Sequence, residues 1–223
     1  MTTAAPRWKK FLFPAFLILL VAGGIAGSML ATRDPQKHVH GWLDRLLWRK
    51  VPAYNFRLTD HNGQPVELAQ FRGKVVVFSF GFTNCPNICP ATLSHFAAIR
   101  KALPEASRDK VQFLFISVDP DRDTRERLAR YVPYFDPSFL GLTGSVQDLA
   151  KAAYAYKASY KKEKPKADDP KNYFVDHTAD AYLIGPDGMW ELSYPFEELP
   201  KKDMIARDIA KLAAPAEKIR SAP

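Results

Sequence analysis

Residues 74–90 read KVVVFSFGFTNCPNICP, and this stretch decides the fold. Its first nine residues form an apolar run rich in β-branched and aromatic side chains, which is typical of a strand buried on both faces of a sheet. Two cysteines, Cys85 and Cys89, follow this run at once, and residues 90–103 have the apolar spacing of a helix. The stretch therefore predicts a central strand that ends directly before a pair of thiols.

Strand-like and helix-like segments alternate around this stretch. Strands are expected at 54–58, 66–68, 111–118, 139–142, 173–176, 181–184 and 190–194, and helices at 124–134, 145–156 and 201–212. The order predicts an α/β fold with a central mixed sheet and helices on both faces. Reactive loops of such sheets lie at the carboxyl ends of the central strands. We therefore expect Asp119-Pro-Asp121, after the second buried strand, to lie beside the cysteines, and Asp123 to cap the helix that follows.

The N-terminal part of the chain predicts a membrane anchor. Residues 11–31 contain no charged side chain, and a stretch of about 20 apolar residues is long enough to cross a bilayer as a helix. Arg7, Lys9 and Lys10 precede it, and positive charge marks the cytoplasmic side of a span. A cleaved signal peptide is the alternative. Both interpretations place the rest of the chain outside the cytoplasm.

The expected organisation follows from this anchor. The main domain would face the periplasm of a bacterial-type inner membrane, or the equivalent non-cytoplasmic side, behind a single transmembrane helix. The predicted segments are a cytoplasmic N-terminus at 1–10, the anchor at 11–31, a tether at 32–51, the α/β domain at 52–214 and a flexible tail at 215–223.

The formal net charge of +8 owes much to six lysines between residues 157 and 171. Acidic residues and prolines interrupt these lysines, so we expect a solvated loop. Binding to nucleic acid is not expected, because the chain is predicted to be exported and has no matching motif. An acidic protein partner or anionic lipid head groups are the alternatives for this loop.

Cys85 and Cys89 are the only cysteines of the chain. A disulfide closing so short a loop gains little from chain entropy, which argues against a purely structural bridge. If a helix begins near Cys85 or Pro86, both sulfurs share one face, and the free N–H groups of the helix favour thiolate. Thiolates bind soft metals such as Cu(I) and also attack disulfides. A soft-metal site is favoured, and a thiol–disulfide oxidoreductase remains open.

A third metal ligand would have to come from the histidines. His177 stands at the end of a late strand, where the following loop can reach the helix of the cysteines, and it is a candidate on that ground alone. His95 is expected to have a structural or surface role, and His61 to be solvated in a turn. His38 and His40 are expected to belong to a polar tether.

Three motifs in order resemble the Sco/SenC family, whose members help to assemble cytochrome c oxidase. FTNCPNICP at 82–90 resembles the copper-site signature of that family, and ISVDPDRDT at 116–124 resembles its second motif. VDHT at 175–178, followed by YLIGPDG at 182–188, resembles the third. The similarity extends over roughly residues 52–213.

The resemblance implies a thioredoxin-like fold and a copper ion, as Cu(I) or Cu(II), bound by Cys85, Cys89 and His177. It implies a metallochaperone for the dinuclear copper site of cytochrome c oxidase subunit II, or alternatively a reductase of the cysteines in that site. Asp119 matches an acidic residue near the family's site, and a turn-forming role is its alternative. Peroxiredoxins have a similar fold, but they require threonine or serine where Phe82 stands before Cys85, so peroxidase activity is not expected.

Overall fold

The computed structural model describes residues 51–164, 169 and 173–214. The chain divides into two units, residues 1–48 and 49–223, and all described residues belong to the second. Apart from Val51, the predicted N-terminus, anchor, tether and C-terminal tail lie outside the described residues. Within the described part, no helix is long and apolar enough to span a bilayer.

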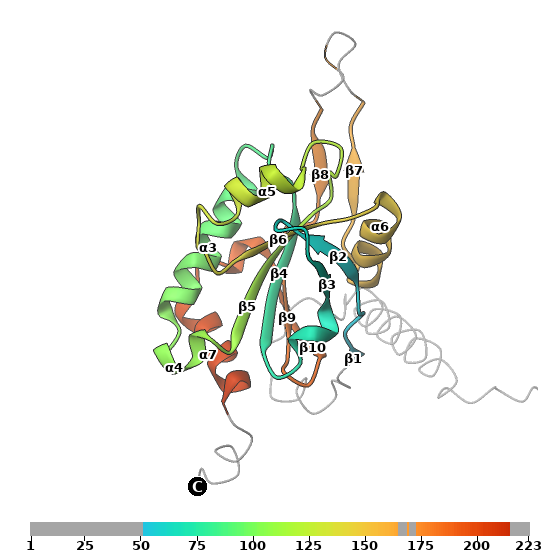
Figure 1. Ribbon diagram of the computed structural model, residues 1–223. Coiled ribbons are helices and arrows are strands. Elements are labelled where there is room, and N and C mark those ends of the chain that lie inside the picture. Colours follow the sequence, from blue (N-terminus) through green and yellow to red (C-terminus); the bar gives the residue numbers. More distant parts are fainter. Residues whose placement is uncertain (1–50, 165–168, 170–172, 215–223) are drawn as a thin grey trace, which may run out of the picture. The chain divides into compact units, whose positions relative to one another are not determined.

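The structure confirms a mixed α/β domain with a curled central sheet (Figure 1). Its strands follow the order β1-β10-β9-β4-β5-β6-β2-β3. Their bounds are Val51–Pro52 for β1, Arg57–Asp60 for β2, Pro65–Glu67 for β3, Val75–Gly81 for β4, Val111–Ser117 for β5, Leu140–Thr143 for β6, Ala181–Ile184 for β9 and Met189–Tyr194 for β10. β4 and β5, and β5 and β6, are parallel, and the other neighbours are antiparallel.

β4 is the central strand that the apolar run predicts, and all of its residues are buried. It pairs with β5 from Val75 opposite Val111 to Gly81 opposite Ser117. Because the two strands are parallel and in register, the loops that follow them leave the sheet at the same edge. A backbone hydrogen bond from Val118 N to Gly81 O, 2.9 Å long, joins the two strands at this edge.

Helices cover both faces of the sheet. α3 and α7 pack together on one face, and α6 lies on the other (Figure 1). The helices are α3 at Ile88–Ala102, α4 at Glu105–Arg108, α5 at Arg125–Tyr131, α6 at Val146–Ala155 and α7 at Lys202–Ala213, with 3-10 turns at Leu68–Phe71 and Phe196–Glu198. Aromatic rings fill both interfaces. Phe96 of α3 lies 5.5 Å from Phe113 between ring centroids, and Phe78 lies 4.8 Å from Tyr156 beyond the other face.

The helix of the cysteines starts two residues before the predicted segment 90–103, but after the start near Cys85 or Pro86 that would place both sulfurs on one helix face. α3 begins at Ile88 rather than near Cys85 or Pro86, so Cys85 lies in the turn before the helix. Asn87 is the N-cap, and the sulfur of Cys85 accepts the N–H of Cys89, which has no partner within the helix. Pro90 falls in the first turn, where its missing N–H removes no helical hydrogen bond.

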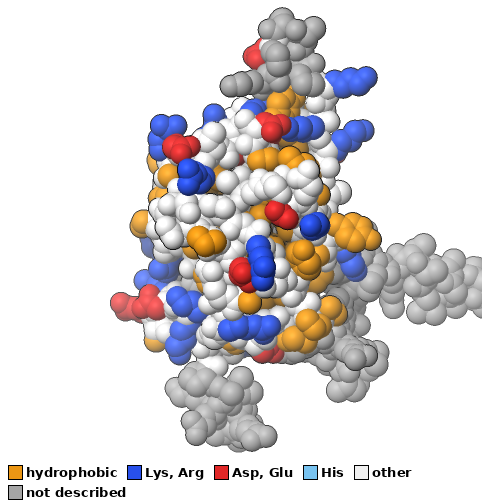
Figure 2. Space-filling model, turned by 45° about the vertical axis from the view of Figure 1, so that its right-hand side comes forward, with side chains coloured by type: hydrophobic (Ala, Val, Ile, Leu, Met, Phe, Trp, Pro, Cys, Tyr) orange, Lys and Arg blue, Asp and Glu red, His pale blue; other side chains and the backbone are white. Residues whose placement is uncertain are grey.

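The segment that contains the six lysines also differs from the prediction. The expected strand at 173–176 is β8, Val175–His177, and it pairs with an unpredicted strand, β7, at Tyr160–Lys162. The predicted solvated loop is therefore wrong for this part. In Figure 2, basic side chains flank the projecting hairpin and are otherwise dispersed among acidic and apolar ones.

The predicted cap of α5 is also wrong. Thr124, not Asp123, is the N-cap, and its hydroxyl accepts the N–H of Arg127. The Asp123 carboxylate instead turns inward, where Ser117 and Thr83 donate to it.

Replacing Phe78 tests the aromatic packing. Its ring is fully buried and contacts four other rings. Phe78→Ala should lower the free energy of unfolding by about 3–5 kcal/mol through cavity formation, measured by chemical denaturation. Tyr154→Ala, on a residue that is 86% exposed, is the matched control and should cost no more than about 0.5 kcal/mol. Equal losses in the two variants would contradict this packing.

Candidate metal centre

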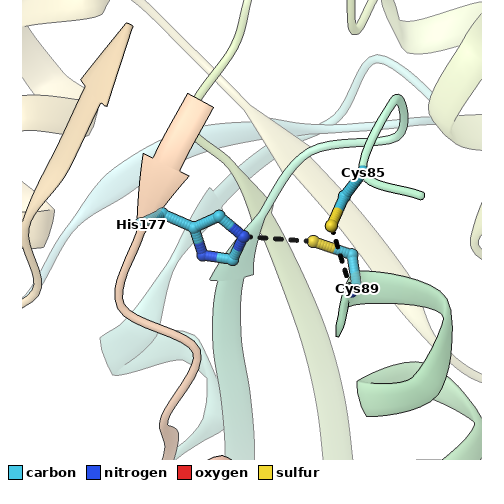
Figure 3. A group of neighbouring side chains, drawn as sticks. All are labelled: Cys85, Cys89 and His177. Carbon is cyan, nitrogen blue, oxygen red and sulfur yellow. Dashed lines mark hydrogen bonds between the residues drawn. The ribbon is translucent and has the colours of Figure 1, made fainter. Parts of the chain in front are cut away.

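Three predicted residues meet at the carboxyl end of β4. Cys85 comes from the turn after the strand, Cys89 from the first turn of α3 and His177 from the end of β8 (Figure 3). Their ligand atoms all lie within 4.8 Å of one another. Cys89 Sγ is 3.3 Å from His177 Nε2, although the two residues are 88 positions apart. This arrangement is able to hold a metal ion.

Backbone N–H groups surround the two sulfurs. Both cysteines are free and buried, Cys85 at 7% and Cys89 at 1% exposure. The N–H of Cys89 donates to Cys85 Sγ over 3.4 Å, and the N–H of Phe82 donates to Cys89 Sγ over 3.5 Å. Hydrogen bonds of this kind stabilise thiolate, the form that binds metals and attacks disulfides.

The two thiols are unequal. The hydrogen bond from the Cys89 thiol lowers the pKa of Cys85 far below its ordinary value, and His177 and backbone N–H groups add to this effect. The same hydrogen bond raises the pKa of Cys89, and burial raises it further. Of the two groups, Cys85 is therefore the one favoured as thiolate and Cys89 the one favoured as thiol.

The imidazole of His177 is oriented with Nε2 toward the cysteines. Its Nδ1 lies 2.9 Å from the carbonyl oxygen of Thr178. Since a carbonyl only accepts, Nδ1 carries a proton, and Nε2 is the ring nitrogen that faces Cys89 Sγ (Figure 3) and that would bind a metal through its lone pair. The ring of Phe82 packs edge-on against this imidazole at 5.6 Å and restrains its plane. A ligand fixed through its second nitrogen is the usual arrangement at metal sites.

Gly81 allows the cysteine helix to approach the strand end. A Cβ atom at this position would lie 2.8 Å from Cys89 Sγ and 2.6 Å from the ring of Phe115. The sequence interpretation missed this role. The available signal was a single glycine within an otherwise bulky apolar strand, which often marks a close approach.

A buried carboxylate, that of Asp123, holds the turn before Cys85 by hydrogen bonds. Asp123 accepts the Thr83 N–H over 2.9 Å and the Ser117 hydroxyl over 2.7 Å. Burial raises the pKa of Asp123. Arg127 reaches the same turn by donating to the Thr83 hydroxyl and to Asn84. These contacts fix the backbone two residues before Cys85.

The other two histidines within the described residues, His61 and His95, make their contacts elsewhere. His61 is half-buried and accepts the Gly141 N–H at Nδ1 over 3.0 Å, so its predicted solvation is wrong. His95 lies on α3 with its ring 6.0 Å from that of Phe196. His38 and His40 lie outside the described residues.

The fold and the centre define a class: a thioredoxin-like domain with a Cys-x-x-x-Cys turn and a distant histidine. The family model described as SCO1/SenC matches residues 49–214. The chain therefore belongs to the SCO1/SenC family.

Individual relatives support the assignment to this family. The mitochondrial SCO2 homolog of Homo sapiens is 39% identical over 174 residues, covering 77% of this chain and 65% of that protein. The mitochondrial SCO1 homolog of Mus musculus is 42% identical over 198 residues, covering 86% of this chain and 68% of that protein. The chain thus spans about two thirds of these relatives.

Two solved relatives contain copper. Bradyrhizobium japonicum ScoI with copper bound has a TM-score of 0.65 at 34% identity, covering 73% of this chain and 99% of its own. Yeast Sco1 with copper bound has a TM-score of 0.65 at 30% identity, covering 78% of this chain and 96% of its own. The present donor set of two sulfurs and one imidazole nitrogen suits the same soft metal.

Selective alkylation tests the unequal thiols. In the reduced, metal-free protein, iodoacetamide should modify Cys85 first, because the lowered pKa keeps it as thiolate. The rate at Cys85 should stay nearly constant from pH 8 to about pH 5, whereas an ordinary thiol with a pKa of about 8.5 would slow steadily over this range. Peptide mass spectrometry identifies the modified residue. Preferential modification of Cys89 would contradict the assignment.

Proposed function

We propose that this chain binds copper through Cys85, Cys89 and His177 and passes it to another protein. The observation that carries the proposal is the convergence of two sulfurs and an imidazole lone pair within 4.8 Å. Thiolate ligands favour Cu(I), and imidazole also suits Cu(II). With three protein ligands, the ion keeps a position that a ligand of the recipient can occupy.

The unequal burial of the ligands orders the transfer. Cys85 and the half-buried His177 lie nearer the surface than Cys89, which is 1% exposed. A recipient ligand therefore replaces Cys85 or His177 first, and Cys89 releases the cargo last. Since the pKa of Cys89 is raised, this thiol gives up its proton when copper binds and regains it on release.

The recipient in this proposal is the dinuclear copper site of cytochrome c oxidase subunit II. A related structure at 29% identity is described as a member of the Sco family of cytochrome c oxidase assembly proteins. The charge-free stretch at 11–31 supports a membrane anchor, and the lysines before it support a domain on the periplasmic side. This placement would bring the domain to the side on which it meets an exported copper site.

Ligand substitutions test copper binding. Cys85→Ser and Cys89→Ser should each abolish stoichiometric Cu(I) binding in competition with a chelator, because the remaining donors do not form a dithiolate. His177→Ala should keep the dithiol and weaken binding by about 10–100-fold. His95→Ala is the matched control and should leave affinity unchanged, because its ring packs against Phe196. Full copper content in either cysteine variant would refute the proposed site.

A second function, reduction of a partner disulfide, is favoured by the charge on Cys85. The Cys85 thiolate would attack one sulfur of the partner and form a mixed disulfide, releasing the partner's other sulfur as a thiolate. Cys89 would then lose its proton and displace the first sulfur. The partner leaves as a dithiol, and Cys85 and Cys89 are oxidised to a disulfide that cannot hold copper.

Trapping tests this second function. Cys89→Ser should accumulate the mixed disulfide with an oxidised peptide carrying the two cysteines of the recipient site, because the resolving thiol is missing. Cys85→Ser should accumulate far less, since Cys89 is only 1% exposed and its burial still raises the pKa of its thiol. Non-reducing electrophoresis with mass spectrometry measures both. Equal trapping by the two variants would exclude the assigned roles.

A further inference from the structure

The hairpin that carries His177 is not part of the central sheet. Among the described residues, β7 and β8 pair with each other, with Tyr160 opposite His177, and with no strand of the central sheet. The hairpin projects from the edge at which β4 and β5 end (Figure 1). The position of this hairpin therefore depends on its short connections to α6 and β9 and on side-chain contacts with the edge of the sheet.

Arg122 lies at the junction. Its side chain is 5% exposed and donates from Nε to the buried carboxylate of Asp119, in the loop after β5. Its Nη1 donates to the backbone carbonyl of Tyr173, just before β8, over 2.7 Å. Its guanidinium lies 3.6 Å from the centroid of the Tyr173 ring. One side chain thus joins the sheet edge to the hairpin by two hydrogen bonds and a stacked ring.

Neighbouring contacts close this cluster. The hydroxyl of Tyr173 donates to the second oxygen of Asp119 over 2.6 Å. Lys162, from the other strand of the hairpin, lies 3.5 Å from Asp119 and 4.9 Å from the Tyr173 ring centroid. Lys162 of β7 and Tyr173, just before β8, are therefore both bound to one carboxylate.

The cluster reaches the imidazole through one aromatic ring. The guanidinium of Arg122 lies 5.5 Å from the centroid of Phe82, and the Phe82 ring lies 5.6 Å from that of His177. Tyr173 is four residues before His177, just ahead of β8. A shift of the hairpin at Tyr173 would therefore move the imidazole away from the sulfurs.

We propose that Arg122 is a positioning residue that fastens the β7–β8 hairpin to the sheet edge and so holds His177 at the dithiol. The part of this proposal that concerns copper binding rests on the function proposed above. A planar guanidinium is needed, because it makes two hydrogen bonds in fixed directions while its face stacks on a ring, and an ammonium group does neither. Loss of this geometry should act on copper through His177 alone.

The metal-free protein provides the first test. Arg122→Lys keeps a positive charge beside Asp119 but removes the planar fork. Backbone amides of β7 and β8 should exchange hydrogen at least about tenfold faster, with β4 and β5 unchanged, because only the hairpin is loosened. Arg100→Lys is the matched control, since Arg100 pairs with Asp136 and Ser138 on the side of α3. Unchanged exchange in the hairpin would overturn the proposal.

Copper affinity in a double-mutant cycle provides the second test. Arg122→Lys should weaken Cu(I) binding by about 10-fold or more in the parent chain, and by less than about twofold in the His177→Ala background. Equal losses in both backgrounds would overturn the route through His177. Tyr173→Leu, which spares the Asp119–Arg122 pair, should repeat the result if Arg122→Lys folds poorly. A parent chain that binds no copper would refute the proposed function and leave the exchange test intact.

Discussion

The parallel pairing of β4 with β5 is the constraint on which the centre depends. Both strands are almost entirely buried and stay in register until Gly81 lies opposite Ser117. Their carboxyl ends must therefore open at one edge, so the cysteine turn and the loop of Asp119 become neighbours. Thr83 and Ser117 then donate hydrogen bonds to Asp123, and these bonds join the cysteine turn to the loop after β5.

Around this edge, each ligand is held by a different element. Cys85 belongs to a turn, and Cys89 belongs to a helix whose approach requires Gly81. His177 belongs to a hairpin outside the sheet. Because the hairpin is a separate element, the imidazole can be displaced while the turn and the helix that hold the two cysteines stay in place. A centre of this kind suits a cargo that has to be bound and later released.

The sequence predicts the core well, because burial leaves a strong pattern. The apolar run of β4 and the late strands predicted at 181–184 and 190–194 are found where the residues indicate. The hairpin was not predictable in the same way. The short segment Tyr160–Lys162 has the composition of a loop. Its last residue, Lys162, donates a hydrogen bond to Asp121, which is 41 residues away in the sequence. His177 was therefore a weak candidate from spacing, and the family resemblance pointed to it.

The central claim is that one imidazole, delivered by the hairpin, completes a dithiol copper site. X-ray absorption at the copper edge, on the reduced protein loaded with one equivalent of Cu(I), tests it most directly. The account predicts a first shell of two sulfur atoms and one imidazole nitrogen, and loss of the nitrogen alone in His177→Ala. A first shell of sulfur only, or one unchanged by that substitution, would contradict it.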